Sequence, residues 1–259
     1  MDYVVFVIVD DVSWPVPILP GLRIVAISDQ ESIASGFLGV NPAILKPLPV
    51  SAWDKALCEI HRSPQFFSNI WLIEDDVFIP SPSSLQALDL DDPTADLLAA
   101  PVNIITATTY RPFRNHGWSW FRHVPFSLLP LPLAHGMVCA IRLSHRLALD
   151  SAQFVQNHSS SLDRRNRLLF RLSVLLRRLR LRPDLIYRFF PPHYLFIEYL
   201  FPTLAVHRGY VISTLEPLST ILWRHEWEPE AMLPTHLYHP MKVIADHPRL
   251  REQMAQRQS

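Results

Sequence analysis

The residue pattern with the clearest chemical meaning is a run of three carboxylates, Glu74, Asp75 and Asp76, directly after the apolar segment 70–73. A short apolar segment of this kind predicts a buried strand, so the three acids stand at its end. Carboxylates this close repel one another unless a cation lies between them. Magnesium and manganese prefer oxygen ligands and also bind diphosphates. We therefore predict a divalent metal site here; the alternative is a solvated acidic turn that precedes a helix.

A second acid with an unusual setting is Glu198, within the mostly apolar segment 193–205, which predicts a helix. Its neighbours include Ile197, Tyr199 and Leu200, so we expect the carboxylate to be partly buried. Burial raises the pKa of a carboxyl group, and a raised pKa suits a general base that works near neutral pH. Glu198 is therefore our candidate base. The alternative is a side chain that reaches solvent or pairs with an arginine.

Alternating strands and helices must position these acids. Apolar segments at 3–9 and 22–27 predict two buried strands, and segments 96–102 and 137–141 predict two more. The segment 52–62 predicts a helix, because a serine in the N-cap position precedes it. This alternation is typical of a doubly wound α/β fold, in which ligands bind beyond the carboxyl ends of the strands.

The predicted strand followed by Glu-Asp-Asp-Val at 74–77 resembles the DxD-type motif of GT-A nucleotide-diphospho-sugar glycosyltransferases, several of which carry the Glu-Asp-Asp form. The resemblance implies one GT-A-like (Rossmann-like) α/β domain over residues 1–259, with a central mixed, mostly parallel sheet flanked by helices. Residues 1–105 would bind the nucleotide-sugar, and residues 106–259 would bind the acceptor. The recognisable motifs cover a small part of the chain, although their order spans most of it.

The resemblance also implies roles for individual residues near the metal. Asp76 and the late histidine His239 would ligate the metal, whereas Glu74 and Asp75 would hold the ribose, the metal's waters or the diphosphate. Lys242 would contact the diphosphate. For the histidine and the lysine, ordinary surface positions are the alternative.

Four residues of the N-terminal part would contact the donor if the resemblance holds. Asp10 and Asp29 follow the first two predicted strands, where the similar fold binds base and ribose. Asp54 and Lys55 lie on the predicted helix 52–62, where such transferases place nucleotide contacts. An exposed charge pair on the helix is the alternative for the last two.

Together these features predict transfer of a sugar from a nucleotide-diphosphate sugar, with a UDP-sugar as first choice, assisted by Mn²⁺ or Mg²⁺. The acceptor would be a glycan, a lipid-linked molecule or a small molecule. The segment around Glu198 resembles the Glu-x-x-x-Pro-Thr helix of several GT-A-like families, in which the acid faces the acceptor. A base in that position predicts inversion at the anomeric carbon, and otherwise a retaining route is equally open.

A loop-rich region between these motifs offers aromatic and basic side chains. Tryptophan faces can stack on sugar rings, although packing on the core explains the same residues. The residues concerned are Arg111, Arg114, His116, Gly117, Trp118 and Trp120. Gly136, slightly later, is expected at a close approach of two backbone segments near the acceptor.

Composition narrows the classes of protein to which the chain can belong. The 24 basic and 24 acidic residues cancel, which argues against a nucleic-acid-binding protein. Two widely separated cysteines, Cys58 and Cys139, form no disulfide or zinc framework and favour a reducing, cytoplasmic location. No basic leader precedes the first apolar segment, and no apolar run approaches the roughly 18 residues of a spanning helix.

Segment 164–182 has a composition unlike the rest of the chain, with eight arginines alternating with leucine, valine and phenylalanine. This pattern predicts a basic amphipathic helix that ends before Pro183. One interpretation is a surface helix whose apolar side packs on the core. The other is peripheral docking on an anionic membrane.

Two other functional classes compete with the transferase. Segment 7–13 resembles the metal-binding opening of sulfatases, which would make the chain a metal-dependent sulfatase-like hydrolase or phosphodiesterase. Neither Cys58 nor Cys139 stands in the Cys/Ser-x-Pro-x-Arg context that a sulfatase nucleophile needs. A non-catalytic protein of the same fold that binds a nucleotide-sugar or a glycan is the third class. The intact group of three acids argues against it.

Overall fold

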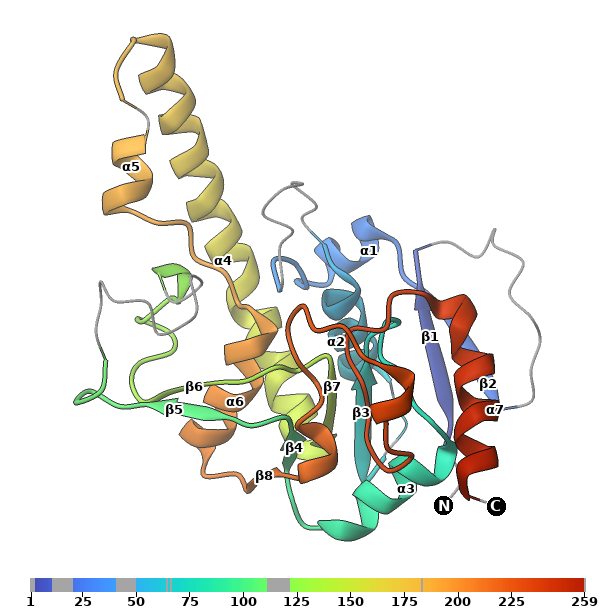
Figure 1. The fold of residues 1–259 in the computed structure, drawn as a ribbon. Coiled ribbons are helices and arrows are strands. Elements are labelled where there is room, and N and C mark those ends of the chain that lie inside the picture. The colour runs from blue at the N-terminus through green and yellow to red at the C-terminus, as the bar shows by residue number, and fades with distance from the viewer. Residues whose placement is uncertain are drawn as a thin grey trace. The chain divides into compact units, whose positions relative to one another are not determined.

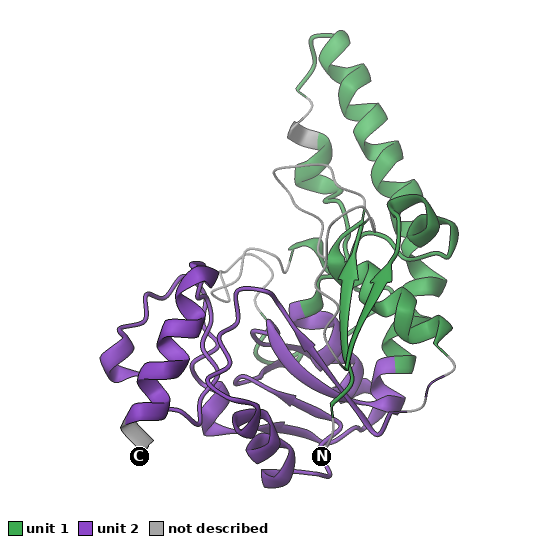
Figure 2. Cartoon of the chain, turned by 90° about the vertical axis from the view of Figure 1, so that its right-hand side faces the viewer, with its two compact units in different colours: residues 1–64, 106–131, 149–197 green, residues 65–105, 132–148, 198–259 purple. Residues whose placement is uncertain are grey.

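The structure is a computed structural model that describes residues 3–10, 21–40, 50–63, 65, 67–110, 122–182 and 184–258. The chain forms two compact units, each assembled from three segments (Figure 2). Unit 1 comprises Met1–Pro64, Thr106–Leu131 and Leu149–Ile197, and unit 2 comprises Gln65–Ile105, Pro132–Ala148 and Glu198–Ser259. One boundary therefore falls at residue 105, but both the N-terminal and the C-terminal parts of the chain contribute to each unit.

Unit 1 contains a two-stranded parallel sheet and most of the helical residues. Strand β1 pairs with β2 in parallel, and Val5 lies opposite Leu22. Two of its helices begin at serine N-caps, because the Ser28 hydroxyl accepts from the Glu31 amide at 3.1 Å and the Ser51 hydroxyl accepts from the Asp54 amide at 3.2 Å. The elements are β1 Val5–Val9, β2 Leu22–Ala26, α1 Asp29–Ala34, α2 Ala52–Arg62, α5 Asp184–Phe189 and most of α4 His145–Arg178.

The long helix α4 has 34 residues, which corresponds to about 50 Å (Figure 1). It ends at Arg178, four residues before the predicted end. The Leu181 amide donates to the Leu176 carbonyl at 2.9 Å, and the Arg180 amide donates to the Arg177 carbonyl at 3.0 Å. Arg180 has φ 58°, so it takes the left-handed position that closes a helix in this hydrogen-bond pattern. Local backbone bonding therefore stops the helix before the chain reaches Pro183, which lies outside the described residues.

Unit 2 is built around a four-stranded sheet with the order β3-β7-β4-β8 (Figure 1). Strand β7 is antiparallel to both of its neighbours, and only β4 and β8 pair in parallel. A separate antiparallel pair joins β5 and β6. The strands are β3 Asn69–Ile73, β4 Leu97–Ala99, β5 Asn103–Ile105, β6 Leu133–His135, β7 Ala140–Ser144 and β8 Ile212–Thr214. The helices are α3 Pro82–Asp91, α6 Ile197–Arg208, α7 His247–Gln258, η2 Glu216–Leu218, η3 Pro229–Ala231 and η4 Ile244–Asp246.

The mixed α/β architecture predicted from the sequence is confirmed, but the described strands do not form one mostly parallel sheet. They belong to three sheets, and three of the five strand pairings are antiparallel. Strand β7 is antiparallel to both β3 and β4, and among these strands only β1 with β2 and β4 with β8 pair in parallel. In the part of the chain that is described, no helix has both the length and the apolar composition to cross a membrane.

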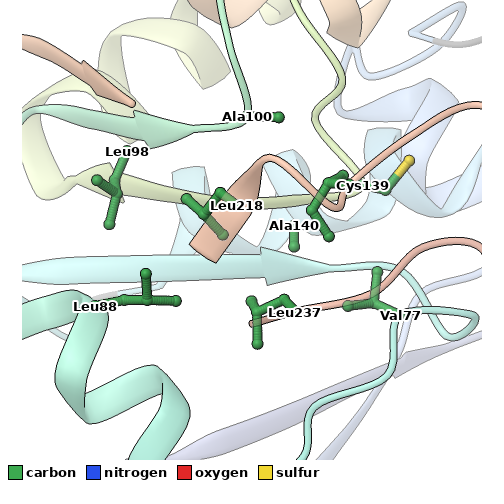
Figure 3. Close-up of a cluster of buried hydrophobic side chains, with 9 residues drawn as sticks. Val77, Leu88, Leu98, Ala100, Cys139, Ala140, Leu218 and Leu237 are labelled. Carbon is green, nitrogen blue, oxygen red and sulfur yellow. The ribbon is translucent and has the colours of Figure 1, made fainter. Parts of the chain in front are cut away.

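The apolar core of unit 2 lies against the sheet and helix α3 (Figure 3). Every member of this core is at most 7% exposed, so the sheet is anchored by close packing. The members are Val77, Leu88, Leu98, Ala100, Cys139, Ala140, Leu218, Ile221 and Leu237. Cys139 stands at the edge of this core, and its sulfur is directed away from the leucines (Figure 3).

A buried charge network ties the sheet of unit 2 to helix α3. Arg142 of β7 is fully buried and donates to the Asp89 carboxylate at 2.9 Å. The same carboxylate oxygen accepts from the Trp71 indole nitrogen of β3 at 3.1 Å. Arg142 also donates to the backbone carbonyls of Asp92 and Ala95. These bonds satisfy the two terminal nitrogens of the buried guanidinium, whereas its Nε has no hydrogen-bond partner among the described residues.

Asp96 forms a second network, at the start of β4. It is buried and accepts from the Arg146 side chain at 2.7 Å and from the Val211 amide at 3.1 Å. The hydrogen bond from Arg146, opposed by burial, lowers the pKa of Asp96 to about 2. The ionised carboxylate is therefore the form that the folded state favours.

Asp96 is expected to make folding sensitive to acid. Because its folded-state pKa lies below the unfolded value, its stabilising effect is complete above about pH 4 and is lost as the pH falls toward about 2. At pH 7, Asp96→Asn should lower the free energy of unfolding by about 2 kcal/mol. Urea titrations at pH 7, 4 and 3 should show the gap to wild type closing. A gap of constant size would contradict this assignment.

Candidate functional site

The predicted acidic strand end is formed within unit 2 and is held by backbone hydrogen bonds. The Glu74 amide donates to the Cys139 carbonyl at 2.8 Å, which continues the pairing of β3 with β7 by one residue. The Val77 amide then donates to the Glu74 carbonyl at 3.2 Å and closes a turn. Within that turn Asp75 is exposed, whereas Glu74 and Asp76 are half-buried. The turn therefore separates the three acids into one that faces solvent and two that face protein.

An extended segment near the C-terminus brings His239 to this turn. Phe78 and Tyr238 form an antiparallel bridge, with amide–carbonyl distances of 2.8 and 3.1 Å. The Met241 amide donates to the Asp76 carbonyl at 2.7 Å. His239 lies between these two anchor points and is 5% exposed. Because backbone bonds hold the segment on both sides of it, the imidazole position is defined by the fold.

The two ring nitrogens of His239 have different partners. Nδ1 lies 2.7 Å from the Leu222 carbonyl, and because a carbonyl only accepts, Nδ1 carries the proton. Nε2 lies 3.3 Å from Asp76 Oδ1 and 3.9 Å from Glu74 Oε2. Nε2 therefore faces two carboxylates, and either a proton on Nε2 or a cation among the three groups would satisfy this arrangement. This arrangement is typical of a metal-binding histidine that a carbonyl orients from behind.

Cys139 is a residue of this site that the sequence did not identify as functional. Its sulfur and the ligand atoms of Glu74 and His239 lie within 4.8 Å of one another. Burial, then the Glu74 charge, raise the pKa of the thiol, so it remains protonated and donates to the Glu74 carboxylate. Knowledge that β3 and β7 pair in antiparallel, with Ile73 opposite Ala140, would have placed Cys139 opposite Glu74. Residues that follow one strand and precede its antiparallel partner must meet.

The residues of the site fit a divalent cation such as Mn²⁺. Ligand atoms of Glu74, His239 and Cys139, one from each, lie within 4.8 Å of one another, and Asp76 Oδ1 lies 3.3 Å from His239 Nε2. The approach of His239 Nε2 to two carboxylates, while Nδ1 is bonded to a carbonyl, is the observation that supports this fit. The predicted ligands Asp76 and His239 therefore lie together, and Glu74 joins them.

Glu198 lies in the first turn of α6, and a proline four residues later shapes its surroundings. Pro202 has no amide hydrogen, so it cannot bond to the Glu198 carbonyl as helix geometry would require. That carbonyl accepts instead from the Gly136 amide at 3.0 Å. A Cβ atom at Gly136 would lie 3.0 Å from the Pro101 carbonyl oxygen, so the close backbone approach predicted there is confirmed.

The Glu198 carboxylate has the properties predicted for a general base. Its Oε2 atom is inaccessible to solvent and has no hydrogen-bond partner within the described residues. Burial, with a smaller contribution from the Glu74 charge, raises its pKa to about 7. A carboxylate of this kind can take up a proton near neutral pH without a large energetic cost.

Lys242 is exposed and follows Met241, whose amide is bonded to the Asp76 carbonyl. The backbone thus places Lys242 next to the residue that anchors the segment to the acidic turn. Its ammonium group forms no ion pair with another described residue, and it can extend into solvent. Its predicted role at a diphosphate remains a prediction.

The predicted donor contacts of the N-terminal part all lie in unit 1. Lys55 is buried and pairs with Asp29 at 2.8 Å and with Asp10. Burial lowers the pKa of Lys55, but the hydrogen bonds to Asp10 and Asp29 outweigh it and the net shift is upward. The lysine therefore stays charged beneath two carboxylates that are largely exposed. An exposed charge pair on the helix, the alternative considered for Lys55, is not what the structure contains.

Asp54 has a local structural role in the same unit. Its carboxylate is fully buried and accepts from the Ser51 amide at 2.8 Å and from the Val40 amide at 3.0 Å. With Ser51 it forms a capping box at the start of α2. Because both carboxylate oxygens accept hydrogen bonds from the protein backbone, Asp54 is not a donor-binding residue in our proposal.

The structure thus brings Glu74, Asp76, Glu198 and His239 into unit 2, and groups Asp10, Asp29 and Lys55 in unit 1. The arginine- and tryptophan-rich stretch 111–120, predicted near the acceptor, lies outside the described residues. Comparison of the sequence with models of protein families and with curated proteins found no match to this chain.

Proposed function

We propose that this protein is a metal-dependent glycosyltransferase with a GT-A-like fold, which transfers a sugar from a nucleotide-diphosphate sugar to an acceptor hydroxyl. The observation that carries the proposal is the meeting of His239 Nε2 with the Asp76 and Glu74 carboxylates at the end of a sheet strand. The mixed α/β architecture is compatible with such a fold. The acidic strand end, the half-buried Glu198 and the late histidine also follow the motif order of these enzymes.

In this proposal, Asp76, Glu74 and His239 hold a divalent cation, with Mn²⁺ or Mg²⁺ as candidates. When bound, such a cation neutralises charge on a leaving nucleotide diphosphate. Asp75 is exposed beside these ligands and is available to the ribose or to metal-bound water. The exposed ammonium group of Lys242 would contact the diphosphate. Cys139 positions Glu74 through its thiol and takes no part in the transfer itself.

Glu198 would act as the general base in unit 2. An acceptor hydroxyl gives its proton to the carboxylate and forms the new bond to the anomeric carbon, while the bond to the nucleotide diphosphate breaks. Attack opposite the leaving group inverts the anomeric configuration. The raised pKa of Glu198 supports this role, since a base with a pKa of about 7 can accept a proton that a typical carboxylate would hold weakly.

Asp10, Asp29 and Lys55 lie in unit 1, and the contacts with the base and ribose predicted for them stay predictions. Asp10 directly follows β1, and Asp29 begins α1 after β2. The side chains of both aspartates are accessible to solvent. Lys55 pairs with both aspartates, and its buried ammonium is not exposed to a ligand. A UDP-sugar, our first choice of donor, is the first to test.

The proposal is tested by release of nucleotide diphosphate from a panel of UDP-, GDP- and other activated sugars. Each donor is incubated with the full chain in Mn²⁺, in Mg²⁺ and in a chelator. Release that needs the metal and occurs with only some donors supports a transferase donor site. Release from simple phosphodiesters or sulfate esters at equal rates would instead indicate a hydrolase. Metal-dependent binding without release would indicate a binding protein.

Glu198→Gln is expected to reduce the transfer rate by roughly 100-fold or more, with the KM for the donor little changed. The amide has the shape of the carboxylate but cannot accept the proton. Once the panel has identified a donor, initial rates over a range of donor concentrations separate the two parameters. Glu252→Gln, at an exposed position of α7, is the matched control and should behave as wild type. Equal rates in both variants would remove Glu198 from the mechanism.

A further inference from the structure

One face of helix α4 exposes a stripe of leucines. Leu168, Leu172 and Leu175 follow the spacing i, i+4 and i+7, which places them on the same side of the helix. Their exposed fractions are 57%, 41% and 50%. Leu179, four residues after Leu175 and just beyond the helix, is 60% exposed. A run of large apolar side chains left in water in this way marks an interaction surface.

Arginines stand directly beside this stripe. Arg164, Arg171 and Arg178 repeat every seven residues, so they form a second line along the same helix. No acidic residue occurs between positions 164 and 182. Among the described residues, neither Arg171 nor Arg178 forms an ion pair. We call the leucine stripe and these three arginines the arginine–leucine surface.

The opposite face of the same helix packs against other residues of unit 1. Ser173 is buried and its hydroxyl lies 3.0 Å from the Tyr187 hydroxyl of α5. The Asn166 side chain donates to the His193 carbonyl at 2.7 Å and accepts from the His193 amide at 3.0 Å. Figure 1 shows α5 beside this part of α4. The packing interpretation of this segment therefore holds for the inner face and leaves the arginine–leucine surface outside the core.

We propose that the arginine–leucine surface docks on an anionic lipid bilayer. The leucines would enter the boundary between headgroups and acyl chains, and the arginines would pair with lipid phosphates and carboxylates. This inference does not depend on the catalytic proposal. It would bring the protein to a membrane surface as a peripheral protein.

Charge and apolar exposure together favour lipid over the other possible occupants. A second copy of this helix would bring arginines against arginines, and the surface has no carboxylates with which to pair them. A nucleic acid would match the arginines but would leave the leucines in water. An anionic bilayer satisfies both parts of the surface at once, since its phosphates lie beside an apolar interior.

The test is co-sedimentation of the full chain with large vesicles of phosphatidylcholine alone or of phosphatidylcholine mixed with phosphatidylserine. We expect binding to the mixed vesicles, weaker binding at high salt and little binding to phosphatidylcholine alone. The triple variant Arg164→Gln, Arg171→Gln and Arg178→Gln should bind the mixed vesicles roughly 100-fold more weakly. The triple variant Leu168→Ser, Leu172→Ser and Leu175→Ser should also lose binding.

The matched control removes the same number of charges elsewhere, through Arg23→Gln, Arg224→Gln and Arg249→Gln, and should retain wild-type binding. Circular dichroism and thermal melting verify that every variant is folded. The proposal is overturned if the control loses as much affinity as the arginine variant. It is also overturned if wild type ignores the mixed vesicles. Sedimentation velocity without lipid tests the second copy: a dimer that the leucine variant abolishes, without vesicle binding, would assign this surface to self-association.

Discussion

Asp76→Ala is expected to abolish metal-dependent release of nucleotide diphosphate, with a fall in rate of about 1,000-fold or more. Asp76 Oδ1 is the carboxylate atom closest to His239 Nε2, at 3.3 Å, so its removal leaves the imidazole and Glu74 to hold a cation alone. The loss should appear with every donor that wild type accepts. Rates of release with saturating Mn²⁺ provide the measurement.

A measurement of Mn²⁺ binding tests whether the variant loses activity because it no longer holds the metal. Isothermal titration of Mn²⁺ should show weaker binding to Asp76→Ala, and His239→Ala should show a similar change. Asp91→Ala removes an exposed carboxylate at the end of α3 and should keep both metal binding and activity. If Asp76→Ala bound Mn²⁺ as wild type does and released product normally, the assignment of the metal to this turn would be wrong.

Asp89→Ala is expected to cause the largest loss of stability, about 3–5 kcal/mol in the free energy of unfolding. Asp89 supplies the carboxylate for the fully buried Arg142 and for the Trp71 indole. Without it, the guanidinium keeps its charge in the core of unit 2 and loses its counter-ion. The cost exceeds that of an ordinary hydrogen bond because water cannot reach the arginine.

Urea unfolding followed by circular dichroism measures this effect. Asp91→Ala, on the same helix and exposed, is the matched control and should change the unfolding free energy by less than about 0.5 kcal/mol. Asp89→Asn keeps the oxygen acceptor and should fall between the two. A loss below about 1 kcal/mol in Asp89→Ala would show that Arg142 finds other partners.

Local sequence signals predicted many of the elements well. Helix α2 spans Ala52–Arg62 as expected, because Ser51 and Asp54 carry a capping box within one turn. Strands β1, β2 and β3 appear within two residues of their predicted positions, since apolar runs bounded by polar residues define them. The acidic strand end and the half-buried Glu198 follow from the same local patterns.

Other features depend on contacts between residues far apart in the chain. The predicted strand at 137–141 begins three residues late, at Ala140, and the Gly136 amide before it is bonded to the Glu198 carbonyl of α6. The antiparallel direction of β7 was not predicted, and with it the position of Cys139 at the site was missed. The strand direction depends on the path of the connecting loop, which residue patterns do not encode.

The sequence by itself determined which residues are chemically able to hold a metal and which segments form strands and helices. Both properties are local, because they depend on side-chain type and on periodicity over a few residues. Only the tertiary structure decided that His239 turns its Nε2 atom toward Asp76, that Asp54 is buried in a cap, and that Lys55 pairs with two aspartates. Those outcomes depend on long-range backbone pairing and burial, which exist only once the chain is folded.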